Sequence, residues 1–426
     1  MIVIGILGLG TVGSGVMSIL QQNSAEIQTK INNDIYIKSV LVRDLKTKRA
    51  LSGDYRLTDR PGDILSDPEI DIIVEVMGGI EPARTYILEA LRNGKNVVTA
   101  NKDLLAEHGN ELLNAAKEAG KDLYFEASVA GGIPIIAALK QSLAANRITA
   151  LMGIINGTTN YILTAMSDQG RDYSEVLAEA QKLGYAEANP ASDVEGLDAA
   201  RKLAILASIA FNSRVILDDV YVEGITKITC EDIQYATELG CTIKLLAVAK
   251  HRDEGLELRV HPAMLPKSHP LASVNDVFNA IYVVGDAVGE TMFYGRGAGS
   301  LPTGSAVVAD IIQVAHNMQN KSTGTVNCTC YHQLPIKQSG EFKTAFFIRL
   351  AVKDEPRVLA TLALLFAEAN ISFASIIQKP RPNQEAEIVL VTHPCREGQL
   401  REALASVAAY HKVLTVHNVI RFESGK

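Results

Sequence analysis

The first residues that could do chemistry lie in the run Gly8–Gly13, GLGTVG, which follows a β-branched stretch and opens a helical pattern. In that context a GxGxxG spacing indicates a dinucleotide-binding turn. Gly8 would permit the tight bend, Gly10 would let the backbone approach a pyrophosphate, and Gly13 would let helix and strand pack closely. The amides at the helix N-terminus would then hold the anion. The alternative is a glycine-rich turn that binds no ligand.

The type of dinucleotide depends on the residues that follow the second expected strand. That strand ends at Val42, and Arg43 comes next, with further basic residues at 46, 48 and 49. A guanidinium suits a 2′-phosphate because it forms bidentate, charge-assisted hydrogen bonds. The sequence therefore predicts a preference for NADP over NAD. Two alternatives stay open: Asp44 could contact a ribose, and the basic residues could simply be solvated.

Two lysines stand where they could transfer a proton. Lys102 ends the run Thr99–Lys102, TANK, directly after the fourth expected strand, where ligands of parallel sheets bind. Lys202 lies four residues after Asp198 on an expected helix, so the two side chains share a face. The plain readings are a surface lysine for Lys102 and an exposed ion pair for the other two residues, worth a few tenths of a kcal/mol.

The composition excludes several classes of protein. The chain has 426 residues, 47% of them hydrophobic and 21% charged, so two or three globular domains are expected. A net charge of −7 argues against nucleic-acid binding. Five cysteines, without metal-ligand spacing, favour a reducing compartment, and we expect a cytoplasmic protein. The opening MIVIGILGLG lacks the basic start of a signal peptide, and no apolar run is long enough for a membrane helix.

The elements that must position these residues alternate between strand and helix in the first third of the chain. This alternation predicts an α/β, Rossmann-type, doubly wound parallel sheet. The expected strands are Ile2–Leu7, Ile35–Val42, Asp71–Val76, Asn96–Thr99 and Leu123–Phe125, and the expected helices are Val12–Gln22, Pro82–Asn93 and Leu104–Ala119.

The rest of the chain predicts two further folds. From Pro134 the pattern becomes α+β, with helices at Ser174–Leu183 and Leu197–Phe211 and hairpins near 243–261 and 281–294. After a polar linker, the tail has the order βαββαβ, which is typical of a ferredoxin-like unit. Its expected elements are Ala345–Val352, Pro356–Ala369, Ile371–Gln378, Glu385–Thr392, Glu397–Ala408 and Val413–Ile420.

Seven motifs together resemble the homoserine dehydrogenase family over residues 1–320, and the tail is similar to an ACT domain. The motifs are GLGTVG, TANK, EASVAGGIP, INGTTNYI, LGYAEANP, DVEGLDAARKLAIL and GRGAGSLPTGSAV. The resemblance implies a Rossmann domain at 1–133 completed by about 300–320, a substrate-binding and dimerisation domain at 134–300, a linker at 321–343 and an ACT regulatory domain at 344–426.

The resemblance implies the NAD(P)-linked interconversion of L-aspartate 4-semialdehyde and L-homoserine, a step toward threonine, methionine and isoleucine. Lys202 would donate the proton and Lys102 would lie near the nicotinamide. Asp198 would orient the lysines, and Glu187, with Asp193, would bind the substrate. The implied cofactor residues are Gly8, Gly10, Thr11, Val12, Gly13, Arg43, Lys102, Gly184 and Gly299. Reduction of an aldehyde places negative charge on oxygen, which a nearby ammonium stabilises and protonates.

The resemblance also implies a cation and an effector. A monovalent cation, expected to be Na⁺, would be held by Glu126, Val129, Gly131 and Ile133. Backbone carbonyls together with one carboxylate suit such a hard cation, although the glycines could serve the turn for steric reasons alone. Threonine is the expected effector of the tail. However, Arg357 stands where the ACT pattern usually has glycine, so the domain could instead serve assembly. A homodimer or a homotetramer is expected.

Two rival functions stay open at this point. One is a Rossmann reductase that acts on a different semialdehyde or amino acid, against which the 187–203 segment argues. The other is an amino-acid sensor whose dehydrogenase body has lost its activity. The retention of Lys102, Glu187, Asp198 and Lys202 argues against that loss.

Overall fold

The computed structural model describes residues 1–47, 53–324 and 329–423. The chain divides into two compact units. Unit 1 comprises Met1–Leu151, Arg201–Asp219 and Phe278–Gln333, and unit 2 comprises Met152–Ala200, Val220–Val277 and Leu334–Lys426. Two elements, strand β7 (Ile148–Ile154) and helix α10 (Leu197–Ala210), begin in one unit and end in the other.

Unit 1 is built on a parallel six-stranded sheet with the order β3-β2-β1-β4-β5-β6. The predicted Rossmann-type sheet is thereby confirmed, because the order reverses beside β1 as in doubly wound folds. All six residues of β1 are buried, as expected for a central parallel strand. The strands are β1 Ile2–Leu7, β2 Ile35–Leu41, β3 Arg56–Thr58, β4 Ile72–Glu75, β5 Asn96–Thr99 and β6 Leu123–Tyr124.

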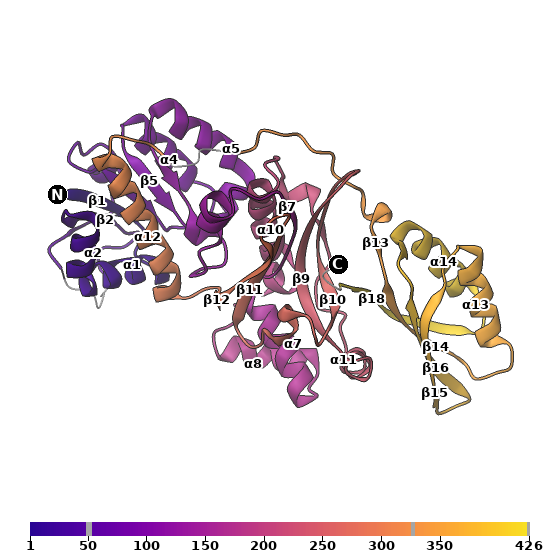
Figure 1. Ribbon diagram of the computed structural model, residues 1–426. Helices are drawn as coiled ribbons and strands as arrows, with labels where there is room; N and C mark the ends of the chain where they lie inside the picture. Colours follow the sequence, from indigo (N-terminus) through magenta and orange to yellow (C-terminus); the bar gives the residue numbers. More distant parts are fainter. Residues whose placement is uncertain (48–52, 325–328, 424–426) are drawn as a thin grey trace. The chain divides into compact units, whose positions relative to one another are not determined.

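Helices pack on both faces of this sheet (Figure 1). The helices that lie wholly in unit 1 are α1 Thr11–Gln22, α2 Ser24–Ile31, α3 Gly62–Leu65, α4 Ala83–Arg92, α5 Lys102–Ala119, α6 Ile135–Ala137 and α12 Ser300–Gln319. Helix α5 begins two residues earlier than the predicted Leu104. The reason is that the side chain of Asn101 accepts the amide of Leu104 and caps the helix there.

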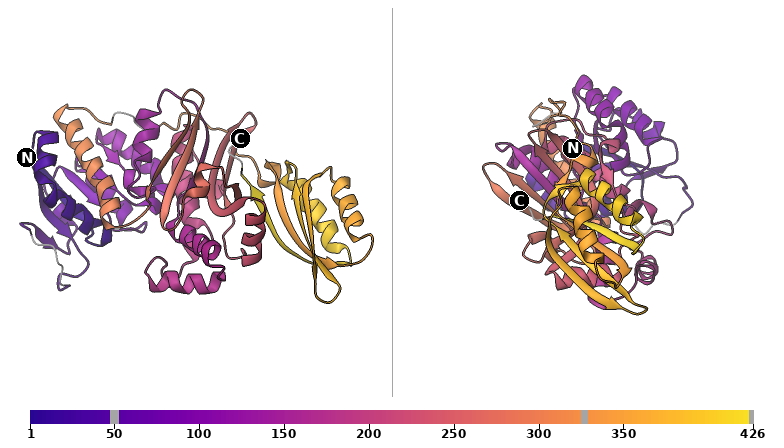
Figure 2. Two further views of the ribbon diagram at one scale, coloured as in Figure 1. Left: turned by 60° about the horizontal axis from the view of Figure 1, so that its bottom comes forward. Right: turned by 90° about the vertical axis from the view of Figure 1, so that its right-hand side faces the viewer.

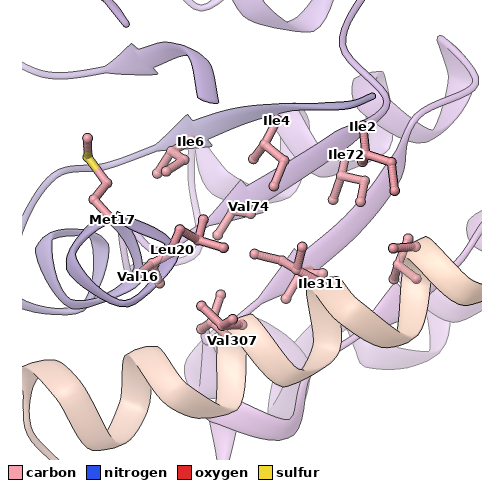
Figure 3. Packing of buried hydrophobic residues seen from close by; sticks show 14 of the residues in the cluster. Ile2, Ile4, Ile6, Val16, Met17, Leu20, Ile72, Val74, Val307 and Ile311 are labelled. Carbon is pink, nitrogen blue, oxygen red and sulfur yellow. The ribbon is translucent and has the colours of Figure 1, made fainter. Parts of the chain in front are cut away.

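Helix α12 completes unit 1, although it lies far from α1 in the sequence (Figure 1). In Figure 3 its residues Val307 and Ile311 face the apolar side chains of β1, β4 and α1. The two helices meet backbone to backbone, since a Cβ added at Gly304 would lie 2.8 Å from the carbonyl carbon of Gly15. Only glycine permits this approach.

Unit 1 also contains the hairpin of β11 (Phe278–Gly285) and β12 (Gly289–Arg296), which are antiparallel and longer than predicted. Unit 2 contains the second predicted hairpin, β9 (Cys241–Arg252) with β10 (Gly255–Pro266), also antiparallel. The short strand β8 (Tyr221–Val222) pairs with β10. The helices of unit 2 before the tail are α7 Gly157–Gln169, α8 Tyr173–Lys182, α9 Ala191–Val194 and α11 Cys230–Glu238.

The tail has the predicted βαββαβ order, with strands arranged β18-β14-β16-β15. Its two helices lie together on one face of these strands (Figures 1 and 2). Phe346, Leu362 and Phe366 are among the side chains buried between sheet and helices. The elements are β14 Phe346–Lys353, α13 Val358–Glu368, β15 Phe373–Arg381, β16 Glu385–Thr392, α14 Glu397–Ala409 and β18 Val413–Phe422.

Buried ion pairs join the tail to the rest of unit 2. Glu423, after β18, accepts a hydrogen bond of 2.6 Å from Lys250 of β9 and one from Arg259 of β10. Arg349 of β14 donates to Asp232 of α11 at 2.7 Å. Because removing one partner of such a pair leaves a buried charge uncompensated, these contacts hold the tail in one register.

The remaining expectations concern the linker, the cysteines and the membrane. Part of the expected linker 321–343, residues 325–328, lies outside the described residues, as do Lys48 and Arg49. The linker ends at β13 (Lys343–Thr344), which pairs with β17 (Cys395–Arg396). The four cysteines that the structure describes carry thiols rather than disulfides. No helix in the described part of the chain has the length and apolar character of a membrane span.

Replacing Gly304 with alanine should destabilise unit 1, because the new methyl group would press on the backbone of α1. Overpacking of this kind costs about 1–3 kcal/mol. The matched control is Gly109→Ala in α5, where an added Cβ meets nothing within 4 Å. That change should be neutral or stabilising by up to about 1 kcal/mol. The apparent Tm of each variant measures the effect, and an unchanged Tm for Gly304→Ala would contradict the close-packing account.

Candidate active site

The three glycines of the GxGxxG turn have the three different surroundings that the motif predicts. Gly8 has a φ of +108°, a conformation that favours glycine, and an added Cβ would lie 2.9 Å from the carbonyl oxygen of Val76. At Gly13 an added Cβ would lie 2.3 Å from the carbonyl oxygen of Gly8. At Gly10 it would meet nothing within 4 Å. The turn is therefore closed on the protein side and open where a pyrophosphate would bind.

Two helices begin beside this turn. Helix α1 starts at Thr11 after Gly10, and α12 starts at Ser300 after Gly299, which has a φ of +122°. Neither capping glycine supplies a side-chain acceptor. The hydroxyl of Ser300 donates to the carbonyl oxygen of Thr11 at 2.8 Å, so the two helix starts are held together. Amides at helix starts, including those of Thr11 and Val12, are suited to an anionic ligand.

The loop after β2 distinguishes between the two residues proposed to contact the ribose. The carboxylate of Asp44 accepts the amide of Lys46 at 2.8 Å and the hydroxyl of Thr47 at 2.9 Å, so it is engaged within its own loop. Arg43 is exposed. The loop thus leaves the Arg43 side chain exposed and holds the carboxylate of Asp44 within its own turn.

A buried carboxylate that the sequence analysis missed orders the loops after β4 and β5. Glu75, at the end of β4, accepts the hydroxyl of Thr99 at 2.6 Å and the amide of Met77 at 2.8 Å. Burial raises the pKa of Glu75, and these hydrogen bonds partly offset the rise. Thr99 in turn accepts the amide of Asn101 at 3.0 Å. Glu75 thus holds in place the segment from Thr99 to Asn101, which directly precedes Lys102.

The two candidate lysines of unit 1 lie on helix segments that an ion pair joins. Lys102 is the first residue of α5, and Lys202 belongs to α10 and is 9% exposed. The next residue of α5, Asp103, pairs with Arg201, the residue before Lys202, at 3.3 Å. The structure therefore brings together the segments that carry both lysines, although they are 100 residues apart.

Unit 2 brings together two of the predicted substrate carboxylates. The amide of Asn156 donates to Asp193 at 2.7 Å and to Asp198 at 2.9 Å. Its oxygen accepts the amide of Thr159 at 2.9 Å and so caps α7. Asn156 lies in the INGTTNYI motif, but the sequence analysis gave it no role. One neutral side chain thus holds two acidic groups and one helix start in a fixed relation.

The predicted ammonium-binding residue lies in an exposed loop after α8. Glu187 is exposed, and Gly184, at the start of the loop, has a φ of +76° and open space beside it. The loop is anchored on α7, because Thr158 donates to the carbonyl oxygen of Tyr185 at 2.7 Å. The rings of Tyr161 and Tyr185 also pack with centroids 4.9 Å apart. Glu187 is therefore accessible to a ligand on a loop of defined position.

One of the predicted cation-binding residues, Glu126, belongs to a buried carboxyl pair in unit 1. Both carboxylate oxygens of Glu126 accept backbone amides, those of Ile136 and Ala137, at 2.7 Å each. The amide of Glu126 donates to Asp310 at 2.8 Å. Burial and the neighbouring Glu126 hold the pKa of Asp310 well above its ordinary value. The side chain of Glu126 thus has a structural task, namely capping α6.

The adjoining loop, which contains Val129, has a glycine-dependent shape. Ala130 and Gly131 both have a φ of +56°, and a Cβ at Gly131 would lie 2.5 Å from the carbonyl of Gly297. Ile133 closes the loop by donating its amide to Ala130 at 3.0 Å. Within the described residues no three His, Cys, Asp or Glu side chains gather as a metal cluster. A cation here would depend on backbone carbonyls.

Comparison with known proteins assigns the family. The family model for homoserine dehydrogenase matches residues 134–312, and the model for the homoserine dehydrogenase NAD binding domain matches residues 8–126. A homoserine dehydrogenase of Bacillus subtilis is 47% identical over 99% of this chain and 98% of its own length. The chain belongs to the homoserine dehydrogenase family.

Solved structures agree with this assignment. The crystal structure of a homoserine dehydrogenase from Thiobacillus denitrificans is 44% identical and has a TM-score of 0.95 over 99% of this chain and 98% of its own. A hyperthermophilic archaeal homoserine dehydrogenase in complex with NADPH is 28% identical, with a TM-score of 0.63. The match covers 97% of that enzyme's chain but only 74% of this one. About a quarter of this chain therefore has no counterpart in that enzyme.

The family assignment settles the reaction. The protein is a homoserine dehydrogenase, an oxidoreductase with an NAD(P)-binding domain. Its reaction interconverts L-aspartate 4-semialdehyde and L-homoserine. The two rival functions, a reductase that acts on another substrate and a sensor that has lost its activity, are therefore set aside.

Replacing Asn156 with aspartate should impair the homoserine dehydrogenase reaction without unfolding α7. Aspartate still caps a helix, but it would face Asp193 and Asp198 as a third anion instead of donating to them. Hydrogen bonds to charged groups contribute about 1.5–3 kcal/mol, so kcat/KM for homoserine should fall by about 10- to 100-fold. Steady-state kinetics measures this change. The control is Asn114→Asp at an exposed position of α5, and equal kinetics for both variants would contradict the role of Asn156.

Proposed function

We propose that Lys202 is the proton donor when this homoserine dehydrogenase reduces L-aspartate 4-semialdehyde. The observation that carries the proposal is the Arg201–Asp103 ion pair, which joins the lysine-bearing segment of α10 to the start of α5. Bound NADPH supplies the hydride. As the hydride reaches the aldehyde carbon, the oxygen becomes an alkoxide, and an adjacent ammonium stabilises and protonates it.

Lys102 and Asp198 assist this step. Lys102 follows β5 at the ligand-bearing edge of the sheet, where it would face the nicotinamide and the substrate. A second ammonium on this side of the substrate adds to the stabilisation of the nascent alkoxide. Asp198 precedes Lys202 by one helical turn on α10 and so orients it.

The acidic residues of unit 2 bind the zwitterionic substrate. Glu187, exposed on its anchored loop, accepts the substrate ammonium. Asp193 and Asp198, which share the amide of Asn156, line the same segment. Carboxylates held in place by a common donor are suited to position a cationic group.

We infer a preference for NADP. Exposed Arg43 is available to a 2′-phosphate, whereas Asp44 is engaged with Lys46 and Thr47. The archaeal homoserine dehydrogenase described with NADPH supports the same cofactor. The turn with Gly8, Gly10 and Gly13 would receive the pyrophosphate, and Gly184 and Gly299 are further expected cofactor contacts.

A monovalent cation, Na⁺, is proposed at the carbonyl oxygens of Glu126, Val129, Gly131 and Ile133. The support is the left-handed backbone of Ala130 and Gly131, which curls this loop. The role of the cation would be to hold the loop in shape, with no part in the proton transfer.

The tail, residues 344–426, is proposed to be an ACT regulatory domain that responds to threonine, joined by the linker 321–343. Its βαββαβ order supports this assignment. The Rossmann part at 1–133 and the substrate-binding part at 134–300 complete the proposed domain plan. We further propose a cytoplasmic homodimer or homotetramer that serves threonine, methionine and isoleucine synthesis.

Lys202→Ala should lower kcat for aldehyde reduction by about 10²- to 10⁴-fold, the range that general acids contribute. Lys117→Ala, at an exposed site on α5, is the control and should retain wild-type kcat. Absorbance of NADPH follows the reaction. Near-normal kcat in Lys202→Ala, together with a large loss in Lys102→Ala, would transfer the role of proton donor to Lys102.

Arg43→Ala should lower kcat/KM for NADP by about 10- to 100-fold, since charge-assisted hydrogen bonds contribute about 1.5–3 kcal/mol. The value for NAD should stay nearly constant because NAD carries no 2′-phosphate. Asp44→Ala is the companion variant and should leave the NAD value unchanged. Parallel assays with both cofactors measure these ratios. A wild-type enzyme that favours NAD, with the same ratio in Arg43→Ala, would contradict the assignment.

A further inference from the structure

A buried lysine outside the proposed catalytic set lies behind helix α7 in unit 2. Lys244 belongs to strand β9, against which α7 packs (Figure 1), and it is 2% exposed. Lysine is rarely buried to this degree, because removing its ammonium from water costs several kcal/mol. Specific contacts must offset that cost, so the surroundings of the Lys244 ammonium indicate what the residue does.

The ammonium of Lys244 is bound by three neutral oxygens. It donates to the carbonyl oxygen of Val274 at 2.6 Å, to the side-chain oxygen of Asn275 at 2.9 Å and to that of Asn160 at 3.1 Å. A lysine ammonium has three donors and no acceptor, so these three oxygens match it in full. A neutral amine has only two N–H groups, and the three acceptors therefore favour the charged form.

The charge of Lys244 is not explained by stability. Burial lowers the pKa of Lys244 to about 8, and the carboxylates of Asp168 and Asp276 oppose this shift. The side chain is thus mostly protonated at neutral pH. A buried charge contributes little to stability, because the cost of its desolvation can exceed the gain from its contacts. The contacts of Lys244 therefore indicate a role in positioning.

The residue of α7 that Lys244 holds lies one helical turn after the cap of that helix. The backbone amide of Asn160 donates to the carbonyl oxygen of Asn156 at 3.3 Å. The side-chain amide of Asn160 donates to the carbonyl oxygen of Val274 at 3.2 Å, so Asn160 and Lys244 share one acceptor. Because Asn156 binds both proposed substrate carboxylates, this cluster fixes the helical turn from which they are held.

A second polar contact fixes the next turn of α7 to the same loop. The hydroxyl of Thr164 donates to the carbonyl oxygen of Asn160 at 2.7 Å and accepts the amide of Asp276 at 3.2 Å. Residues 156, 160 and 164 are spaced by four, so they form a polar stripe along one side of the helix. Helix α7 is thus held along its flank as well as at its start.

We propose that Lys244 is a positioning residue for the homoserine dehydrogenase reaction, because its ammonium holds Asn160 and thereby sets the position of Asn156. The acidic pair that Asn156 binds is placed in turn. Lys244 itself touches neither substrate nor cofactor in this arrangement. The inference rests on the proposed function of Asp193 and Asp198 as substrate-binding residues and adds a residue that acts through them.

Lys244→Met tests the proposal, because methionine keeps most of the volume of the side chain but has no donor. The KM for homoserine should rise by about 3- to 30-fold, the range of coupling through packed networks. The values of kcat and of the KM for NADP should stay near wild type. A merely structural role would lower the apparent Tm and the fraction of active enzyme, and so kcat, without raising KM. Lys267→Met, at an exposed site after β10, is the control and should retain wild-type kinetics.

Asn275→Ala is a milder test of the same contact. Asn275 is exposed, so its truncation leaves the core intact and removes one of the three acceptors of Lys244. The KM for homoserine should rise by about two- to threefold. A wild-type KM for homoserine in folded Lys244→Met enzyme, or in Asn275→Ala, would overturn the proposal.

A double-mutant cycle with Asn156→Asp separates this inference from the proposed function. If Lys244 acts through Asn156, Lys244→Met should raise the KM for homoserine by a smaller factor in the Asn156→Asp background than in the wild-type background. Equal factors in the two backgrounds would overturn the proposal. Wild-type kinetics in Asn156→Asp itself would contradict the proposed substrate site and the inference with it, whereas wild-type kinetics in Lys244→Met alone would leave that site standing.

Discussion

The hydrogen bonds from Asn156 to Asp193 and Asp198 are the contacts on which the proposed substrate site depends. Two carboxylates close together repel each other, and their repulsion grows as water is removed. A neutral amide that donates to both offsets part of this repulsion and fixes their positions. Because the same side chain caps α7, the position of the acidic pair is coupled to the start of a helix. The helix that begins beside this pair, α10, also carries Lys202 one turn later.

The nucleotide-binding end depends on a different constraint, namely that backbone segments must approach one another closely. Glycines at 13, 15 and 304 let a strand and two helices meet where any side chain would clash. The two helix starts at Thr11 and Ser300 are thereby brought together from opposite ends of the enzyme core. The backbone amides at these helix starts, together with the open space at Gly10, then leave a place for a phosphate. Close packing of the backbone and access for a phosphate thus both require glycine, for different reasons.

The sequence alone predicted most of the fold, because hydrophobic periodicity is a local signal. The strands Asn96–Thr99 and Glu385–Thr392 were predicted with the bounds that the structure has. The strands β3 and β7 and the helices α2, α7, α11 and α12 were not predicted. The 20-residue helix α12 is rich in apolar residues, and it was missed because its segment was assigned to a motif and to no element. The predicted βαββαβ order of the tail was also found.

The site was less predictable, because its order depends on contacts between distant residues. Glu75 bonds Thr99 across 24 residues, and Asn156 bonds Asp198 across 42. No local spacing reveals such pairs. Motifs could name Lys102 and Lys202, but only the Arg201–Asp103 pair shows that their segments meet. The strained backbone of Arg357 is likewise invisible in the sequence, although its departure from the glycine pattern gave a hint.

The central claim is that the ammonium of Lys202 protonates the nascent alkoxide. Chemical rescue tests it directly: small primary amines are added to the Lys202→Ala enzyme while aldehyde reduction is followed. We expect the rate to recover in proportion to amine concentration, with a dependence on amine pKa that is typical of general acids. An absence of rescue at Lys202→Ala, with clear rescue at Lys102→Ala by the same amines, would contradict the account.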